Sequence, residues 1–398
     1  MEFLIFILTF FLGIFAGIIT GILPGVHINL IAALAISLPL AFSISPIAFI
    51  IFIVSMTITS AFMDFIPSIF LAAPDENTAL SVLPGHQFLL KGQGHHALRL
   101  SLIGATISLI LLVIIVPIFI LVIPKIYPFL QRMMGFFLIW IVILMILGEK
   151  EGKLKCLTIF ILAGFLGLST LNLHLSQPLL PMLTGLFGSA TLVTSIKTKT
   201  KIPKQNTEKI PIKKDQIIKP MIITSFISPL ASIFPGLGNS EAAVIGSRIG
   251  GKLSREQFLI LMGSINILVV SISFLALWLL QKTRTGVAAA VNQITQIGPK
   301  ELWIILFVII LTALIAYPLT IYTSKIFASY VNKFSYSKIS LSILIFLSII
   351  VIFVSGLLGF LVFIVATLLG ITAIEYNIRR AFLMGCLLIP TILFYLPF

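Results

Sequence analysis

Two short stretches, ILPGVHINL at residues 22–30 and IFPGLGNSE at residues 233–241, decide how this chain is expected to fold. Each places Pro-Gly, followed by polar side chains, inside a long apolar segment. Proline removes a backbone donor and clashes with the preceding helical turn, and glycine permits unusual backbone angles. Irregular backbone at membrane depth is tolerated only where protein buries it or a cavity hydrates it. We therefore expect two broken helices inside a membrane protein.

The composition around these stretches is that of a polytopic helical membrane protein. Of the 398 residues, 59% are hydrophobic and only 10% are charged, and the mean hydropathy is +1.20. Apolar runs long enough to span a bilayer occur at 101–123, 256–280, 302–324 and 339–374. We expect an all-α fold with about 10–12 membrane segments. The first apolar segment has neither a positive start nor a cleavage site, so it is interpreted as part of the mature fold.

One hydrophilic stretch divides the chain. Residues 195–220 carry eight lysines, two acidic residues and three prolines, which suits a mobile cytoplasmic linker near anionic lipid. We expect a first transmembrane repeat at 1–195, a linker at 196–219 and a second repeat at 220–398. Cytoplasmic loops then explain the net charge of +14, so no nucleic-acid partner is expected. Two isolated cysteines exclude a disulfide framework and a CxxC metal site.

Counting crossings from a cytoplasmic linker predicts repeats of opposite orientation. Going back from it, the apolar spans are 178–195, 155–171, 133–148 and 101–123. Going forward, 217–250 enters and returns, 256–280 crosses outward and 302–324 crosses back. The loop after the first Pro-Gly element, 85–99, then faces inward, and its counterpart near 282–300 faces outward, as in inverted-repeat carriers. The protein is expected in the plasma membrane, and the same counting places its N-terminus outside. It also requires four external cations, Lys125, Arg132, Lys282 and Arg284.

Twelve acidic residues are few enough to interpret one by one. Glu149, Glu151, Glu208 and Asp215 lie in basic loops and are expected to be solvated, whereas Glu2, Glu256 and Glu301 lie near span ends. Five others adjoin or interrupt apolar runs: Asp64, Asp75, Glu76, Glu241 and Glu375. A charge at the bilayer centre costs a few kcal/mol, so these five should face protein or a water-filled cavity.

The polar residues behind each Pro-Gly are candidates for a substrate site. A helix that restarts after a break offers free N–H groups and a positive dipole end to a carboxylate or phosphate. His27 and Asn29 follow the first break, and Asn239, Ser240 and Glu241 follow the second. For a single motif a simple proline kink is the better interpretation; two at matching places favour binding. Arg248, two turns beyond Glu241, is either its counter-charge or a cytoplasmic anchor.

A third polar segment, 71–108, contains PDENT and three of the five histidines. The spacing of His86, His95 and His96 is poor for zinc, so they are expected to be solvated loop residues. The chain has no HExxH and no GxSxG, and His27 is the one candidate base at membrane depth. We therefore expect neither an enzyme nor a resident metal or cofactor.

These stretches resemble the large membrane subunit of the tripartite tricarboxylate transporters, the TctA family. The resemblance rests on four ordered segments: GILPGVHINL, then PDENTALSVLPGHQFLLKGQGHHALRLSLIGATIS, then PMLTGLFGSA at 181–190, then FPGLGNSEAAVIGS. No single motif is specific, and their order and spacing carry the case. The chain is shorter than the bacterial subunits, has His27 and Asn29 behind the first Pro-Gly, and has a more acidic PDENT segment. It therefore resembles a divergent, short, archaeal-like branch.

The resemblance implies an inverted-repeat secondary carrier for small organic anions, driven by Na⁺ or H⁺. It implies a substrate site at Pro24, Gly25, His27 and Asn29 with Pro235, Gly236, Gly238, Asn239 and Ser240. Near the entrance would lie Asp75, Glu76, Asn77 and Thr78, with Asp64 or Glu241 as the ion-coupling carboxylate. The implied partners are membrane lipid, a small membrane subunit and an extracytoplasmic binding protein. The departures argue against dependence on the binding protein, and a homodimer stays an alternative to the monomer.

Two other classes of function stay open. A polyprenyl-phosphate translocase would also bind an anion at broken helices, although no arginine cluster, which would favour phosphate, lies near the Pro-Gly motifs. Such a translocase should have a lateral groove open to the bilayer, whereas a carboxylate carrier should have a polar pathway. An intramembrane enzyme would need a nucleophile-base pair or metal ligands.

Overall fold

A computed structural model places helices along nearly all of the chain that it describes. It describes residues 2–23, 28–35, 45–71, 76–149, 152–175, 177–197, 202–208, 210–234, 238–282, 285–331 and 336–396. No strand occurs among these residues, which confirms the all-α prediction. The first half contains α1 (Glu2–Ile22), α2 (Ile28–Ala35), α4 (Pro46–Met63), α5 (Phe65–Phe70), the 3₁₀ helix η1 (Glu76–Ser81), α6 (Val82–Leu89), α7 (Gly94–Leu147), α8 (Lys153–Asn172), α9 (Leu179–Leu183), the π-helix η2 (Thr184–Ser189) and α10 (Ala190–Lys197). The second half contains α11 (Lys214–Ile233), α12 (Asn239–Ile249), α13 (Arg255–Leu280), α14 (Gly286–Ile294), α15 (Pro299–Tyr330), α16 (Tyr336–Glu375), the 3₁₀ helix η3 (Arg380–Met384) and α17 (Gly385–Tyr395).

Eight helices within the described residues are long and apolar enough to cross a membrane, so the protein is a multi-pass membrane protein. All four apolar runs named from the sequence lie in such helices: α7, α13, α15 and α16. Glu2, Glu256 and Glu301 lie in the first turns of α1, α13 and α15, as expected for span ends. There their charge also complements the positive end of the helix dipole.

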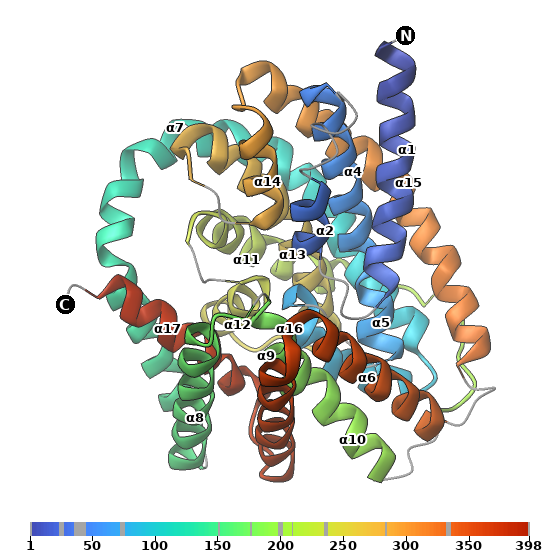
Figure 1. The fold of residues 1–398 in the computed structure, drawn as a ribbon, viewed down its shortest axis with the longest axis vertical. Helices are drawn as coiled ribbons and strands as arrows, with labels where there is room; N and C mark the ends of the chain where they lie inside the picture. Colours follow the sequence, from blue (N-terminus) through green and yellow to red (C-terminus); the bar gives the residue numbers. More distant parts are fainter. Residues whose placement is uncertain are drawn as a thin grey trace.

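The longest helix, α7, makes two crossings. Its 54 residues contain Pro117, Pro124 and Pro128, which remove helical hydrogen bonds and bend the helix. Gly94, at its start, donates its N–H to Gln205 of the linker at 2.9 Å. Tyr127 lies at the far end of the molecule, under Lys282, at the C-terminal end of α13. In Figure 1, α7 runs along the top and then down the left edge of the view. The predicted spans 101–123 and 133–148 are therefore its two arms.

α16 is likewise a pair of helices joined at one residue. Gly356 has φ 68° and ψ −171°, a conformation that breaks the helix and that favours glycine. Ser355 Oγ donates to the carbonyl of Gln177 at 3.1 Å, between α8 and α9. Glu375, at the other end of the second arm, pairs with Lys197 of α10.

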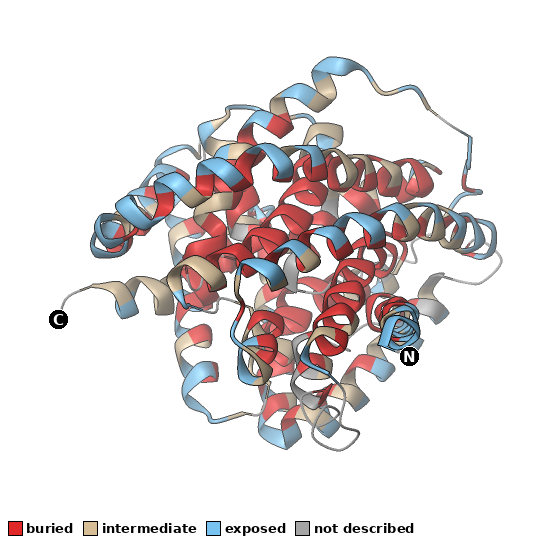
Figure 2. Cartoon of the chain, turned by 90° about the horizontal axis from the view of Figure 1, so that it is seen from above, coloured by how far each residue is buried: buried red, intermediate tan, exposed pale blue. Residues whose placement is uncertain are grey.

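The core is formed by α4 and α13. In α4–α5 and α13, 83% and 94% of the most apolar window is buried, whereas α1, α7 and α16 remain open on one side. α1 and α15 pack on α4, and α7 and α11 pack on α13. Figure 2 shows this as a buried centre inside a partly exposed ring of helices, as expected of helices that face lipid.

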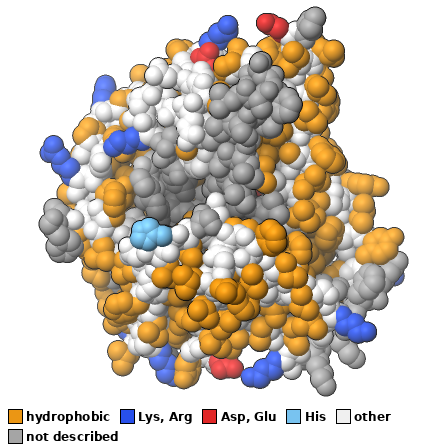
Figure 3. Space-filling model, viewed as in Figure 1, with side chains coloured by type: hydrophobic (Ala, Val, Ile, Leu, Met, Phe, Trp, Pro, Cys, Tyr) orange, Lys and Arg blue, Asp and Glu red, His pale blue; other side chains and the backbone are white. Residues whose placement is uncertain are grey.

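Polar contacts show that charged side chains lie at two opposite ends of the molecule. At the linker end, Gln257 Nε2 donates to the carbonyl of Asp215 at 3.2 Å. At the opposite end, Lys282 Nζ donates to Gln131 Oε1 at 3.2 Å. The 26 residues of α13, about 39 Å of helix, separate the two ends. Figure 3 shows apolar side chains over the lower part and along the right side of one face, and Lys and Arg side chains towards its periphery.

The two helices that precede the Pro-Gly motifs enter from opposite ends. α1 runs parallel to α4, because Gly13 faces Phe52 and Ser55 whereas Gly21 faces Ser60 and Met63. α4 continues through α5 to Phe70, which lies against Gly94 at the linker end. α1 therefore starts at the opposite end.

α11 starts at the linker end and runs parallel to α13. Thr224 bonds Ser264 at 2.5 Å, and Ser232 Oγ donates to the carbonyl of Val269 at 3.3 Å. α12 then returns, because Gly246 and Gly250 pack on Ile223. α12 therefore runs back alongside α11, which is the arrangement that an entry and return of 217–250 requires.

Candidate functional site

The second break separates α11 from α12 at a buried level of the molecule. Phe234 is extended after the end of α11, and α12 begins at Asn239 with Gly238 as its N-cap. Gly238 has no side chain, so no N-cap group satisfies the first N–H groups of α12. Asn239 is 1% exposed and Ser240 is fully buried. The second break thus brings a helix N-terminus into the protein interior.

Two amide side chains join this break to the first half of the protein. Asn239 Nδ2 donates to Asn266 Oδ1 of α13 at 2.8 Å, and Asn266 Nδ2 donates to the carbonyl of Ala61 in α4 at 3.0 Å. Asn266 is fully buried. We call Asn239, Asn266 and Ala61 the asparagine bridge.

The asparagine bridge has a fixed polarity. Ala61 offers a carbonyl, so Asn266 must turn its NH₂ group towards Ala61 and its oxygen towards Asn239. Asn239 must then turn its own NH₂ group to Asn266, and no described residue bonds the buried Asn239 Oδ1. An amide oxygen ligates hard cations or accepts a proton donor, whereas helix N–H groups donate to anions. The start of α12 therefore combines an acceptor with donors.

α1, the helix that precedes the first Pro-Gly motif, ends beside the same part of α4. A Cβ added to Gly21 would lie 2.5 Å from Met63 Cβ and 2.8 Å from the carbonyl of Ser60, so α1 ends against α4 next to Ala61. Ser60 Oγ donates to Asp64 Oδ1 at 3.2 Å, and Asp64 is 7% exposed. A buried carboxylate thus lies one helical turn from the asparagine bridge.

The third polar segment joins the same region through η1. η1 packs against α12 and α13. Ser68 Oγ donates to the carbonyl of Asp64 at 2.8 Å and pairs with Thr78 Oγ1 at 2.6 Å. A serine has one hydroxyl proton, so Thr78 is the donor in that pair. Ser68 thereby links Thr78 to the segment that carries Asp64.

The predicted site residues fall into three groups. Gly238, Asn239, Ser240, Asp64 and Thr78 lie in the region just described. The backbones of four others lie in α2, η1 and α12, with side chains outside the described part of the chain: Asn29, Glu76, Asn77 and Glu241. Six fall wholly outside the described residues: Pro24, Gly25, His27, Asp75, Pro235 and Gly236.

Three residues of this region were not predicted from the sequence: Asn266, Ser60 and Ser68. Asn266 could have been recognised as a candidate, because it is the one asparagine in the apolar run 256–280. A lone amide in a membrane helix tends to face another helix rather than lipid. Ser60 and Ser68 carried no such signal, since serines in membrane helices often bond their own backbone.

The expectation of solvated histidines is wrong. His86, His95 and His96 are buried, because residues 82–99 form α6 and the start of α7 rather than a loop. His95 Nδ1 and Ser324 Oγ of α15 form a hydrogen bond of 2.8 Å. Burial, with a smaller contribution from the Arg380 charge, lowers the pKa of His86 to about 4, so it is neutral at neutral pH. Among the described residues no group of three His, Cys, Asp or Glu side chains could hold a metal ion.

Glu149, expected to be solvated, is instead a largely covered ion-pair partner. Its side chain is 11% exposed, and its Oε1 accepts from Arg248 Nη2 at 2.7 Å and from Arg379 Nη1 at 3.1 Å. The end of α7 lies against the end of α12, which shields Glu149 from most of the solvent. The described partner of Arg248 is therefore Glu149, at the linker end.

Comparison with known proteins gives one family and one relative. Residues 7–385 match the model of the tripartite tricarboxylate transporter TctA family. The uncharacterized protein MJ1079 of Methanocaldococcus jannaschii is 28% identical over 385 residues, which cover 93% of this chain and 94% of the relative. No solved structure matches the chain.

Proposed function

Because the chain belongs to the tripartite tricarboxylate transporter TctA family, we propose that it is a secondary active carrier for small organic anions. Membership makes it a transport protein. Its proposed cargo is a carboxylate, moved by a Na⁺ or H⁺ gradient and bound between the two broken helices. No other cofactor is required.

The asparagine bridge is the observation that supports this proposal best. It connects the start of α12 to α4 at the point where α1 ends, so both broken elements meet at one buried level. They arrive there from opposite ends of the molecule. A site between such elements can be reached from either side in turn, as alternating access requires.

The chemistry divides between donors and acceptors. In the proposal, the N–H groups at the start of α12 bind the anion, and Ser240 orients it. Asn239 Oδ1, held as an acceptor, ligates the coupling cation, with the Asp64 or Glu241 carboxylate as its charged partner. Asn29 orients the anion from the first break, where Pro24, Gly25 and His27 form the matching element.

The proposed topology follows from the two ends. The linker end, with residues 196–219, is assigned to the cytoplasm, and the N-terminus to the outside of the plasma membrane. Repeats at 1–195 and 220–398, of opposite orientation, are supported by the parallel pairs α1–α4 and α11–α13. The family implies membrane subunits and a binding protein in general; we propose that this chain does not depend on the binding protein.

A lipid-phosphate translocase is the second candidate, and one cavity favours it. A cavity of about 330 Å³ lies between α7 and the end of α11, lined by apolar side chains that include Phe129, Trp140 and Phe234. Phe234 adjoins the second break, so a lipid chain in this cavity would place a phosphate near the start of α12.

Uptake into liposomes separates the two candidates. The purified protein would be reconstituted and tested with labelled di- and tricarboxylates under imposed Na⁺ and pH gradients. Gradient-driven uptake by the wild type, lost in a Gly25→Leu, Gly236→Leu double variant, is expected. Folded protein that carries no member of the panel but exchanges polyprenyl phosphate between leaflets would overturn the carboxylate proposal.

A further inference from the structure

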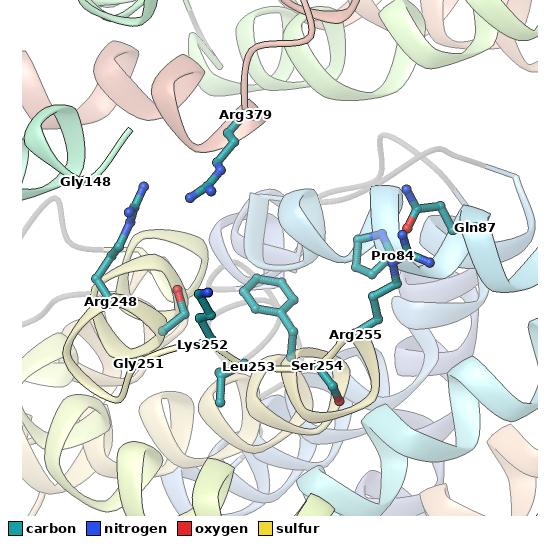
Figure 4. A pocket seen from close by; sticks show the side chains of 12 residues that line it. Pro84, Gln87, Gly148, Arg248, Gly251, Lys252, Leu253, Ser254, Arg255 and Arg379 are labelled. Atoms are coloured by element: carbon teal, nitrogen blue, oxygen red, sulfur yellow. The ribbon is translucent and has the colours of Figure 1, made fainter. Parts of the chain in front are cut away.

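A basic cavity of about 770 Å³ opens at the linker end, away from the asparagine bridge. Four of its lining residues are cationic: Arg248, Lys252, Arg255 and Arg379. In Figure 4, Arg379 approaches from one side, whereas Arg248 comes from the end of α12, Lys252 from the connection that follows and Arg255 from the start of α13. This cavity is not used in the site described above.

Two of the lining arginines already bind one carboxylate. Glu149, next to the lining residue Gly148, shares a single oxygen between Arg248 and Arg379. Guanidinium groups bind carboxylates through charge-assisted hydrogen bonds, so this arrangement fits the carboxylate of another molecule equally well. Glu149 occupies the place that such a ligand would take.

The cations that do not bind Glu149 favour the binding of an anion in this cavity. Lys252 and Arg255 are exposed and form no ion pair with a described residue. Four lining cations against two neighbouring carboxylates, Glu149 and the Glu256 that follows Arg255, leave an excess of two positive charges around the cavity. Such an excess attracts anions of charge two or three most strongly.

One helix connects this cavity with the proposed substrate site. α12 begins at Asn239, in the asparagine bridge, and ends beside Arg248. Its 11 residues span about 16 Å. An anion that leaves the N-terminus of α12 towards the linker end would travel this distance to reach the cavity.

We propose that this cavity is a second, weaker binding site for the carried di- or tricarboxylate. There a substrate carboxylate displaces Glu149 from Arg248 and Arg379. The inference rests on the proposed function, since it takes the same anion as ligand. Because Glu149 ties the α7–α8 turn to α12, displacement also frees the end of α12 to move.

Equilibrium binding of labelled citrate to the purified full chain tests this assignment. The wild type should show two classes of sites. Glu149→Gln removes the internal competitor and should tighten the weaker class about tenfold. Lys252→Gln with Arg255→Gln should weaken that class tenfold or more without changing the tighter one. Lys300→Gln, an exposed cation at the start of α15, is the matched control and should change neither class.

Several outcomes would overturn the assignment. The Lys252, Arg255 double variant breaks no described ion pair, so unchanged citrate binding in this folded protein would contradict it. In nanodiscs, loss of the weak class when phosphatidylglycerol replaces phosphatidylcholine would show that a lipid phosphate occupies the cavity instead. Uptake keeps the two proposals separate, because a wild type that binds citrate in the cavity but transports no anion would contradict the proposed function alone.

Discussion

Asn266 is a single residue that connects elements from both halves of the chain. Its NH₂ group bonds Ala61 and its oxygen accepts from Asn239, both in the interior. Asn266→Leu keeps most of the volume but leaves the Ala61 carbonyl and the Asn239 NH₂ group buried without partners. Each unsatisfied group costs about 1–3 kcal/mol.

We therefore expect Asn266→Leu to lower the Tm of the detergent-solubilised protein by several degrees. Asn292→Leu, at an exposed position of α14, is the matched control and should change the Tm little. Equal Tm values for the two variants would mean that the asparagine bridge does not stabilise the fold.

His86 gives the protein a pH-dependent stability. Its pKa is lowered from 6.5 to about 4 in the folded protein, so between these values the unfolded chain binds more protons. The contribution of neutral His86 to the free energy of unfolding is therefore fully present above pH 6.5. It falls as the pH drops towards 4, by up to about 3 kcal/mol. His86→Gln should flatten this fall in a Tm titration, whereas His174→Gln, at an exposed position, should not. Identical curves for the wild type and His86→Gln would refute the assignment.

At the scale of elements, α1 binds α4 through small residues. A Cβ at Gly17 would lie 2.5 Å from the Met56 carbonyl oxygen and 2.6 Å from Thr59 Cβ. Gly17→Leu must therefore push the helices apart, at a cost of about 3 kcal/mol, the upper end for overpacking. Thermal unfolding should show a large loss, compared with almost none for Phe15→Leu on the exposed face of α1. A small loss in both would contradict the close approach.

The break in α16 depends on backbone conformation alone. Gly356 has a positive φ, and nothing lies within 4 Å of an added Cβ. Gly356→Ala should therefore cost about 1–3 kcal/mol, because a positive φ combined with a ψ near 180° is essentially restricted to glycine. Gly356→Asn should cost about as much, because the tolerance of asparagine for positive φ is confined to the left-handed helical region, where ψ is about +30 to +60°. A Tm of Gly356→Ala equal to that of the wild type would contradict a strained backbone at this break.

Elements could be predicted from the sequence where apolar length or proline decided them. The apolar runs predict two spans at 101–123 and 133–148, and both lie in one continuous helix, α7, which contains three prolines. The prediction of a solvated loop at 85–99 is wrong, because it rests on the polar side chains of this segment, three of which are buried. Burial of His86, His95 and His96 depends on which helices pack over them, and α15 lies far away in the sequence.

At the scale of the whole molecule, the two ends followed from the positions of lysine and arginine. Lys125, Arg132 and Lys282 are predicted to be external, and the contact between Lys282 and Gln131 is consistent with one common end for them. The asparagine bridge could not be predicted, because it depends on the rotation of α4, α12 and α13 about their axes. The ion pairs of Glu149 could not be predicted either, because its partners lie 99 or more residues away in the sequence.

The arrangement of the two broken elements has one consequence for transport. α1 and α11 come from opposite ends, and each is held to a core helix, α4 or α13, by close contacts. The core helices are joined at Ala61 and Asn266. In the proposed carrier, movement of one broken element against its core helix would open the substrate site to one end while the other element kept the opposite end closed.

Thiol labelling at the start of α12 tests most directly whether this region binds the carried anion. Ser240→Cys would be made in a Cys156→Ala, Cys386→Ala background and labelled with a membrane-permeant maleimide in proteoliposomes. Residue 240 is fully buried in this structure, so labelling reports the openings of the carrier that expose it. Citrate or succinate should slow labelling at residue 240 several-fold and leave labelling of Ser329→Cys, an exposed position on α15, unchanged. Labelling of residue 240 at the same rate with and without these anions would contradict a carboxylate site at the paired helix breaks.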